Sequence, residues 1–207
     1  MVSMSDIQED LSQYFIIQGK FTIDPHSHVV DVQGAVKLIQ SCDQMPVQFG
    51  RVDGAFVCVA KGLTTLKGAP AHVGGDFHCD RNLLSSLEAG PQHVEGSYYC
   101  ESNLLTDLSH MPSFVGDQFC CYDNPLHSLA GWDPGHHVGG EFWCTYGHNL
   151  PLLRCIQASG VSLSDHNVNA PGAVSHILNK YAGKGKSHML NCALELKKAG
   201  YAKNATW

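Results

Sequence analysis

The sequence is poor in charged residues and has no long apolar run. Only 15% of its 207 residues are charged, against roughly 25% in an ordinary soluble chain. No segment reaches the roughly 18 consecutive apolar residues of a membrane span. The stretch from Met1 to Asp6 has neither the basic start nor the apolar run of a secretion signal. We therefore expect a cytoplasmic protein of one large domain or two small ones.

The usual cysteine frameworks are also missing. The nine cysteines are an odd number and fall well short of the roughly 8–10% of residues that marks a disulfide scaffold. No Cys-x-x-Cys pair of a zinc or redox site occurs in the sequence. We therefore expect the cysteines to be reduced.

The sequence lacks the short motifs of common enzymes. It has no phosphate-binding loop, no His-Glu-x-x-His and no Gly-x-Ser-x-Gly. A net charge of −6 argues against a protein that binds nucleic acid over its whole surface. These absences predict a non-enzymatic protein without cofactor or metal.

The chain does contain an internal repeat of about 21 residues. An aromatic residue, any residue and a cysteine recur five times, and these cysteines are 21, 21, 21 and 23 residues apart. They are Cys58, Cys79, Cys100, Cys121 and Cys144. A valine precedes each tripeptide, leucines follow it, and Asn82, Asn103 and Asn124 share one further position. Such a period predicts a solenoid, in which each unit stacks on the next.

Each repeated position has a physical role. In a short strand the aromatic residue and the cysteine two positions later point to the same side, so both should stack inward, the cysteine as a small buried hydrophobe. The asparagine should bond buried backbone groups where the chain leaves the strand. Only six residues separate Leu87 from Val94. Because this is too short for a helix, the opposite side of each unit should be irregular.

The pattern Phe-x-Cys-x-x-Asn-x-Leu resembles the Leu-x-Leu-x-x-Asn-x-Leu part of leucine-rich repeats. Val73-Gly-Gly-Asp-Phe77, Lys67-Gly-Ala-Pro70 and the tail from Lys180 to Trp207 are similar to short leucine-rich repeat proteins of tailed bacteriophages. Lys61 and Gly147 depart from the pattern at the Asn position. The resemblance implies an α/β leucine-rich-repeat solenoid with short parallel strands on its concave face, an N-terminal cap and a C-terminal helical hairpin. It implies no catalytic residue.

We divide the chain into three parts. Residues 1–51 are expected to form an N-terminal cap and a degenerate first repeat, and residues 52–157 a solenoid of about five units. Residues 158–207 are expected to form a linker and a basic helical hairpin, with the polar segment from Ala158 to Pro171 as the linker.

Helices are expected at both ends of the chain. The first runs from Ser5 to Gln13 and has a serine as its N-cap. The hairpin helices are expected at Ala173–Tyr181 and Ser187–Ala199, and the second carries an apolar stripe of Leu190 and Leu194.

The residue between each aromatic residue and its cysteine should point outward, onto the concave sheet. With their flanking residues these positions form an aromatic strip with acidic edges, which is typical of a protein-binding surface because Trp and Tyr are favoured anchors there. The partner-binding residues predicted on this strip are Val57, Asp76, His78, Asp80, Tyr99, Glu101, Cys120, Tyr122, Glu141 and Trp143. The other interpretation is that these are ordinary scattered exposed aromatics. Cys120 is also the candidate for a reactive thiol, although no His or Asp partner can be assigned to it.

The C-terminal segment is a second candidate surface. Residues 171–207 hold six lysines against one acidic residue, Glu195. The candidate basic contacts are Lys180, Lys184, Lys186, Lys197 and Lys198. Two interpretations stay open: an arm that binds nucleic acid or an acidic partner, and a cap whose lysines face solvent.

Histidines form another column. His72, His93 and His137 each precede the valine of their unit, and Phe114 interrupts the series. Zinc needs three or four converging ligands, and this column offers His72 and His93 as its one adjacent pair. We therefore predict a structural column and no metal site. A response to pH is a second interpretation, since the chain has 13 histidines.

These features predict a non-enzymatic module for protein–protein interaction that binds its partner through the concave strip. The resemblance implies a phage-encoded modulator or inhibitor of a host or anti-phage defence protein, in the cytoplasm of a bacterial cell. The alternatives are a nucleic-acid-associated protein that uses the basic helices, and a structural protein of the virion.

Overall fold

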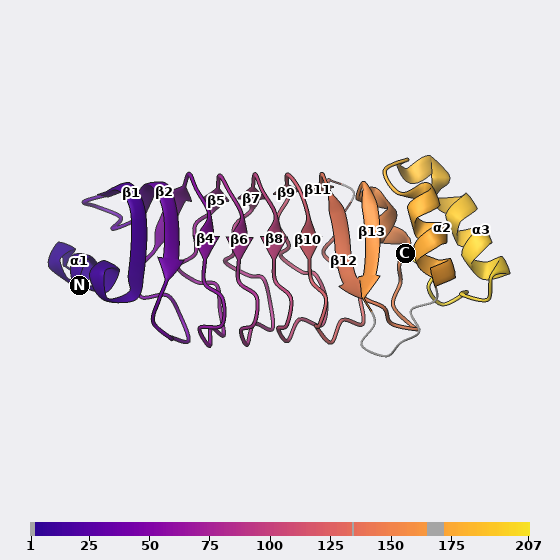
Figure 1. Ribbon diagram of the computed structural model, residues 1–207, viewed down its shortest axis with the longest axis horizontal. Helices are drawn as coiled ribbons and strands as arrows, with labels where there is room; N and C mark the ends of the chain where they lie inside the picture. The colour runs from indigo at the N-terminus through magenta and orange to yellow at the C-terminus, as the bar shows by residue number, and fades with distance from the viewer. Residues whose placement is uncertain (1–2, 134, 165–171) are drawn as a thin grey trace.

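The protein is a parallel β-solenoid of about six turns that carries three helices (Figure 1). The computed structural model describes residues 3–133, 135–164 and 172–207. The repeat solenoid predicted from the sequence is confirmed. None of the helices in these residues is both long enough and apolar enough to cross a membrane.

The elements follow one another along the chain as short strands between helical ends. The helices are α1 (Met4–Tyr14), α2 (Gly172–Tyr181) and α3 (Met189–Lys198), with the 3-10 segments η1 (Leu153–Gln157) and η2 (Lys186–His188). The first strands are β1 (Phe15–Ile23), β2 (Val30–Leu38), β3 (Phe49–Val52), β4 (Phe56–Val57), β5 (His72–Val73), β6 (Phe77–His78) and β7 (His93–Val94). The remaining strands are β8 (Tyr98–Tyr99), β9 (Phe114–Val115), β10 (Phe119–Cys120), β11 (His137–Val138), β12 (Glu141–Thr145) and β13 (Gly160–Ser164).

Each coil contributes two short strands, where the repeat predicted one. The odd-numbered strands from β3 to β11 form one parallel ladder, and the even-numbered strands from β4 to β12, with β13, form the other. The longer β2 pairs with both β3 and β4 and so joins the ladders. In later coils a bend at residues such as Gly75 divides the strand. A Cβ at Gly75 would lie 2.8 Å from Ala55 N of the preceding coil, so glycine is required for the coils to approach here.

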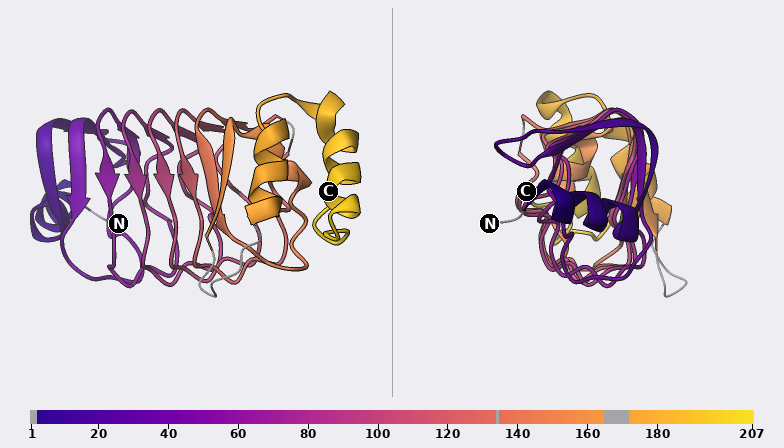
Figure 2. Two further views of the ribbon diagram at one scale, coloured as in Figure 1. Left: turned by 45° about the vertical axis from the view of Figure 1, so that its right-hand side comes forward. Right: turned by 90° about the vertical axis from the view of Figure 1, so that its left-hand side faces the viewer.

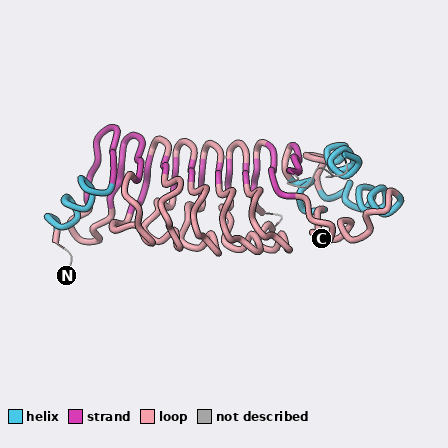
Figure 3. The backbone as a smooth tube through the Cα atoms, turned by 60° about the horizontal axis from the view of Figure 1, so that its bottom comes forward, coloured by secondary structure: helices cyan, strands magenta, loops and turns pink. Residues whose placement is uncertain are grey.

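The two strands of each coil lie on either side of a short turn, and loops complete the rest of the coil. Figure 1 shows the even-numbered strands from β4 to β10 side by side on the face toward the viewer, and Figure 3 shows the loops beneath them. This arrangement agrees with the predicted irregular side, which contains no α-helix between Phe56 and Asp133.

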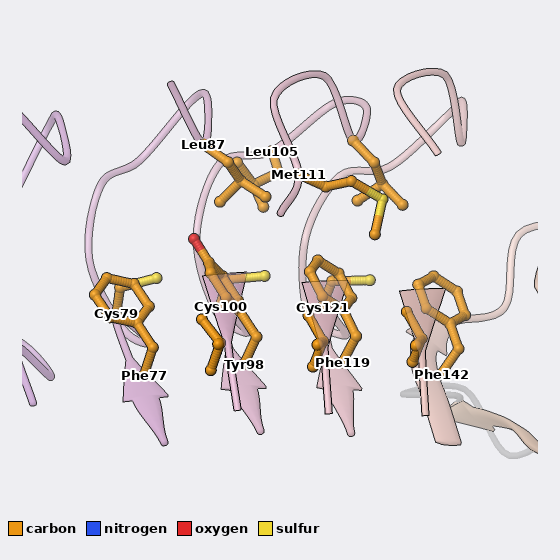
Figure 4. Packing of buried hydrophobic residues seen from close by; sticks show 14 of the residues in the cluster. Phe77, Cys79, Leu87, Tyr98, Cys100, Leu105, Met111, Phe119, Cys121 and Phe142 are labelled. Atoms are coloured by element: carbon orange, nitrogen blue, oxygen red, sulfur yellow. The ribbon is translucent and has the colours of Figure 1, made fainter. Parts of the chain in front are cut away.

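The interior is a ladder of rings and thiols (Figure 4). The rings of consecutive coils lie with their centroids 5.0 to 5.8 Å apart; they are Phe56, Phe77, Tyr98, Phe119 and Phe142. The repeat cysteines are fully buried. Burial raises the pKa of Cys79 and Cys100 well above the usual thiol value, so these side chains stay protonated and pack as hydrophobes.

Buried asparagines satisfy the backbone where each coil leaves its strand. The Asn103 amide donates to the carbonyl of Cys100 in its own coil and to that of Cys79 in the coil before, both at 3.1 Å. Its Oδ1 accepts a bond from Leu84 N at 3.1 Å. The asparagines one coil before and one coil after repeat these bonds. Each asparagine therefore links two coils, as the sequence predicted.

Helix α1 and the β1–β2 hairpin close the N-terminal end of the solenoid (Figure 2). The helix begins earlier than predicted: its N-cap is Ser3 and not Ser5. Ser3 Oγ accepts a bond from Asp6 N, and the Asp6 carboxylate accepts one from Ser3 N. This reciprocal capping box fixes the first turn. The helix then buries Ile7 and Leu11 against the core.

The segment predicted as a linker begins instead with a strand. Val161 of β13 pairs in parallel with Phe142 of β12, so the ladder continues past the last repeat cysteine. Helix α2 covers the free edge of β13. Asn179 Oδ1 accepts a bond from Val161 N at 2.8 Å, and its Nδ2 donates to Val161 O at 2.7 Å. A side-chain amide thus takes the place of a further strand. The rest of the predicted linker, residues 165–171, lies outside the described residues.

Helices α2 and α3 form the predicted hairpin, but the predicted apolar stripe is wrong. Leu190 and Leu194 are 70% and 47% exposed. The buried residues of α3 are Cys192, Ala193 and Leu196. Two of these are small, which lets α3 pack closely on its neighbours α2 and η1.

The chain end closes the last coil. Asn204 is 1% exposed, and its amide donates to Gly147 O and Leu150 O at 2.9 Å each. Gly147 stands at the repeat position that asparagine occupies in earlier coils, so this coil has no amide of its own at that place. Asn204, which is far along the chain, donates hydrogen bonds to the backbone of this coil instead. The cation of Arg154 lies 4.8 Å from the centroid of the Trp207 ring, which holds the tail further.

Candidate functional site

The predicted surface residues lie in a row across the coils. Parallel pairing places Val57 beside His78, His78 beside Tyr99, Tyr99 beside Cys120, and Cys120 beside Trp143. The binding strip, as we name it, consists of Val57, His78, Tyr99, Cys120 and Trp143 with the flanking Asp76, Asp80, Glu101, Tyr122 and Glu141. The residues on either side of each row position along the chain point inward and are buried, so the strip is the outer face of the even-numbered ladder.

Aromatic rings give the strip a flat and ordered surface. The His78 and Tyr99 rings are stacked, with centroids 4.5 Å apart and planes 10° from parallel. Both residues and Trp143 are half-buried. Because the strand pairing and the stacking fix their orientation, a ligand that packs on them orders few side chains.

Cys120 does not have the exposure that the sequence predicted. Its exposed fraction is 5%, because it lies between the larger side chains of Tyr99 and Trp143 in the row. Burial raises its pKa to about 12, with Glu101 adding a smaller effect. The thiolate is therefore scarce at neutral pH, and Cys120 does not have the properties of a reactive cysteine.

Glu101 is the most perturbed carboxyl group of the strip. Burial raises its pKa to about 7, and the nearby Asp80 contributes in the same direction while Arg81 opposes it. Asp80 is 7% exposed; its carboxylate lies 3.8 Å from His78 Nδ1 and 4.0 Å from Arg81 Nε. The acidic edge is therefore a partly desolvated pair of carboxyl groups with one arginine, Arg81, beside it.

Two buried polar atoms of the strip have no hydrogen-bond partner. They are Glu101 Oε2, an acceptor, and Trp143 Nε1, a donor. An unpaired buried polar atom costs about 1–3 kcal/mol. Because both atoms are closed to solvent, a ligand reaches them only after these side chains move outward. A ligand that then supplies a donor to Glu101 and an acceptor to Trp143 relieves this cost.

The other edge of the strip is bound to the scaffold. Asp76 Oδ1 accepts a bond from Ser97 N at 2.8 Å, and Glu141 accepts one from the Ser162 hydroxyl at 2.9 Å. Asp76 and Glu141 therefore shape this edge through bonds to the scaffold. Tyr122 is half-buried and lies on the opposite edge, at the repeat position of Asp80 and Glu101 in the next coil.

Two of the C-terminal lysines are engaged within the helical hairpin, one between α2 and α3 and one in the turn after α2. Lys180 forms an ion pair with Glu195 at 2.7 Å, and Lys184 Nζ donates to the Lys180 carbonyl. Lys197 and Lys198 lie exposed in the last turn of α3. The side chain of Lys186 lies outside the described residues.

The histidine column forms a continuous stack of rings. The centroids of His72 and His93 are 4.7 Å apart, those of His93 and Phe114 4.4 Å, and those of Phe114 and His137 5.0 Å. Phe114 therefore joins the stack, where the sequence predicted that it interrupts the column. The phenyl ring of Phe114 is flat and similar in size to an imidazole, so it fills the same position in its coil as the histidines do in theirs.

A cavity near the N-terminal end was missed by the sequence. Its volume is 480 Å³, and it lies against β1, β2 and β3. The lining residues include Phe21, which is 43% exposed, and the ion pair of Arg51 with Asp53 at 2.6 Å. The sequence does not predict this cavity, because its lining residues come from β1, β2 and β3, and β1 and β3 come close together only because each pairs with β2.

Known proteins give no assignment for this chain. No family model, no curated protein and no solved structure matches it. The function is therefore argued from the geometry: the strip combines stacked rings with a buried acidic edge, an arrangement suited to binding a cationic or planar group.

Proposed function

We propose that the protein is a non-enzymatic interaction module, and that its binding strip holds a basic segment of a partner protein. One observation carries the proposal: the rings of Tyr99 and Trp143 lie along a face whose acidic edge has an unpartnered carboxyl oxygen on Glu101. Aromatic residues anchor many interfaces. The basic segment of the partner runs from coil to coil along the row of outward-facing residues, across the direction of the strands.

A cationic side chain is the ligand that suits this face best. An arginine or lysine gains from the ring faces of Tyr99 or Trp143 and donates hydrogen bonds to Glu101. The positive charge also favours the ionised form of Glu101, which burial disfavours. An acidic segment would meet Asp80 and Glu101 at close range and be repelled.

We further propose that the solenoid is of the leucine-rich repeat type and is related to the bacteriophage proteins that it resembles. The recurring asparagine, with bonds to two coils at each step, supports this proposal. On this view the partner is a bacterial host or defence protein, and the module modulates or inhibits it in the cytoplasm.

The proposal is tested by affinity capture from bacterial lysate with matched variants. The Tyr99→Ala/Trp143→Ala variant removes the rings of the strip. The control Leu83→Ala/Leu104→Ala removes two side chains that are 53% and 50% exposed on the loops. We expect the wild type and the control to retain a common partner and the strip variant to lose it. Retention by a strip variant with native circular dichroism and melting temperature contradicts the proposal.

A charge variant distinguishes a basic ligand from an apolar one. Glu101→Lys keeps the rings but places a positive charge at the acidic edge, so capture of a basic partner should fall. Nucleic-acid binding by the C-terminal helices gives the opposite pattern. Capture then survives both strip variants, is lost in Lys197→Ala/Lys198→Ala, and falls steeply with salt.

A further inference from the structure

A second cluster of chemically active groups lies away from the binding strip, on the odd-numbered ladder. It consists of His72, His93 and Glu95, and their possible ligand atoms all lie within 4.8 Å of one another. His72 and His93 are direct neighbours on β5 and β7. Glu95 comes two residues after His93, so the alternation of the strand directs it to the same side.

The cluster is held in place by ring stacking. The His93 ring lies between two others: the His72 ring at 4.7 Å and 14°, and the Phe114 ring at 4.4 Å and 8°. Contact from both faces restricts rotation of His93. The two imidazoles therefore present their ring edges in one direction without the entropy cost of ordering two free side chains.

The lone pairs needed for a metal ion are available. His72 Nε2 is buried and has no hydrogen-bond partner. His93 Nε2 lies 3.0 Å from Glu95 Oε1, which is close to the spacing of roughly 3.3 Å between ligand atoms around a tetrahedral zinc ion.

We propose that His72 Nε2, His93 Nε2 and a Glu95 carboxylate oxygen bind one zinc ion, with water as the fourth ligand. Two imidazoles and a carboxylate are a recurrent zinc ligand set that leaves one position open. Binding requires small rotations, since the widest ligand separation of 4.8 Å must close. The exposed Glu95 side chain and the half-buried His72 ring allow this movement, while His93 stays in place between its stacked neighbours.

No metal site was predicted here, because the column of histidines offers only His72 and His93 as an adjacent pair and zinc needs at least three ligands. The third ligand is Glu95, which directly follows β7, and the column of histidines alone does not reveal it. A zinc ion at this place joins two consecutive coils outside the hydrophobic core.

The test is calorimetric titration of zinc chloride into the full chain after dialysis against a chelator. We expect one zinc ion per chain and a zinc-dependent rise in melting temperature. His72→Ala and Glu95→Gln should each weaken binding by at least about tenfold. The matched control is His137→Ala, which removes the last ring of the same stack but none of the three ligands, and it should bind as the wild type does.

Three results overturn the proposal: no stoichiometric binding, equal binding by Glu95→Gln, or a loss in His137→Ala as large as that in His72→Ala. If His72→Ala does not fold, Glu95→Gln decides, because it changes one exposed side chain with little change of shape. Cobalt provides an independent readout, since it should show the intense visible absorption of a tetrahedral site in the wild type and lose it in Glu95→Gln.

Discussion

Single residues show clearly what the repeat can and cannot predict. Asn103 recurs at a fixed place among apolar positions, which predicts an inward amide, and the structure gives it backbone partners in two coils. The burial of Cys120 is different. It depends on the size of Tyr99 and Trp143, which are distant in sequence and become its neighbours only when the coils stack.

The first prediction concerns the asparagine ladder. Asn103→Ala leaves the Leu84 N–H without its partner, while the carbonyls of Cys79 and Cys100 each lose one of two bonds and keep those from Asn82 and Asn124. An unpaired buried group costs about 1–3 kcal/mol, so the free energy of unfolding should fall by about that amount in urea titration. The control Leu104→Ala, at an exposed neighbour, should change it by less than about 0.5 kcal/mol. Equal effects would contradict the role of the ladder.

The second prediction concerns pH and Glu101. Its pKa in the folded protein is about 7, above the ordinary value of 4.5. Between these values the folded state binds more protons than the unfolded state, so the stability contributed at Glu101 is lost as pH rises through this window. Glu101→Gln, which stays neutral, should therefore gain stability relative to the wild type between about pH 5 and pH 8. The urea concentrations at the unfolding midpoint, measured for both proteins at about pH 5 and about pH 8, test this. If the difference between Glu101→Gln and the wild type is the same at both pH values, the prediction is wrong.

At the scale of elements, the sequence predicted the inward and outward faces but not the number of strands. The tripeptide around each cysteine marks the even-numbered ladder, whereas the second ladder has only a valine and one neighbour per coil. The strand β13 escaped prediction for a similar reason. Its segment looks polar, and its pairing with β12 becomes visible only in the folded chain.

The third prediction concerns the covered edge of β13. Asn179→Ala removes both bonds to the Val161 backbone, so the Val161 amide should exchange with deuterium about tenfold faster. Asn191→Ala, at an exposed position of α3, serves as the control and should leave this exchange unchanged. Equal rates in all three proteins would show that α2 does not protect the edge.

At the scale of the whole molecule, the repeat determines the coil and the two ends determine where it stops. Each coil contacts only its neighbours, so an uncapped end would expose the core and a row of strand groups. The helices expected near both ends of the chain are present. The sequence does not predict that Asn204 bonds the coil of Gly147, because the two residues are far apart in sequence and belong to no repeated pattern.

The fourth prediction concerns this closure. Asn204→Ala removes the donor to the Leu150 carbonyl and one of the two donors to the Gly147 carbonyl, which keeps its bond from Leu150 N. The melting temperature should fall by several degrees, as a loss of about 2 kcal/mol implies. The control is Asn149→Ala, at an exposed position beside the same coil, which should melt as the wild type does. A wild-type melting temperature for Asn204→Ala would show that the tail does not stabilise the last coil.

The whole chain also carries its charge unevenly, with acidic groups along the binding strip and lysines in the C-terminal helices. This division supports a basic partner for the strip, since like charges across an interface are repelled. The proposed zinc site is on the other ladder, so binding of a basic segment and binding of zinc should be independent of each other.

Selection from a library of short random peptides tests the central claim most directly. The library is first depleted on the Tyr99→Ala/Trp143→Ala variant and then selected on the wild type. The account predicts enrichment of peptides that carry lysine or arginine, and at least about tenfold weaker binding of these peptides to Glu101→Lys. Selected peptides without basic residues, or equal binding to the strip variant, would contradict it.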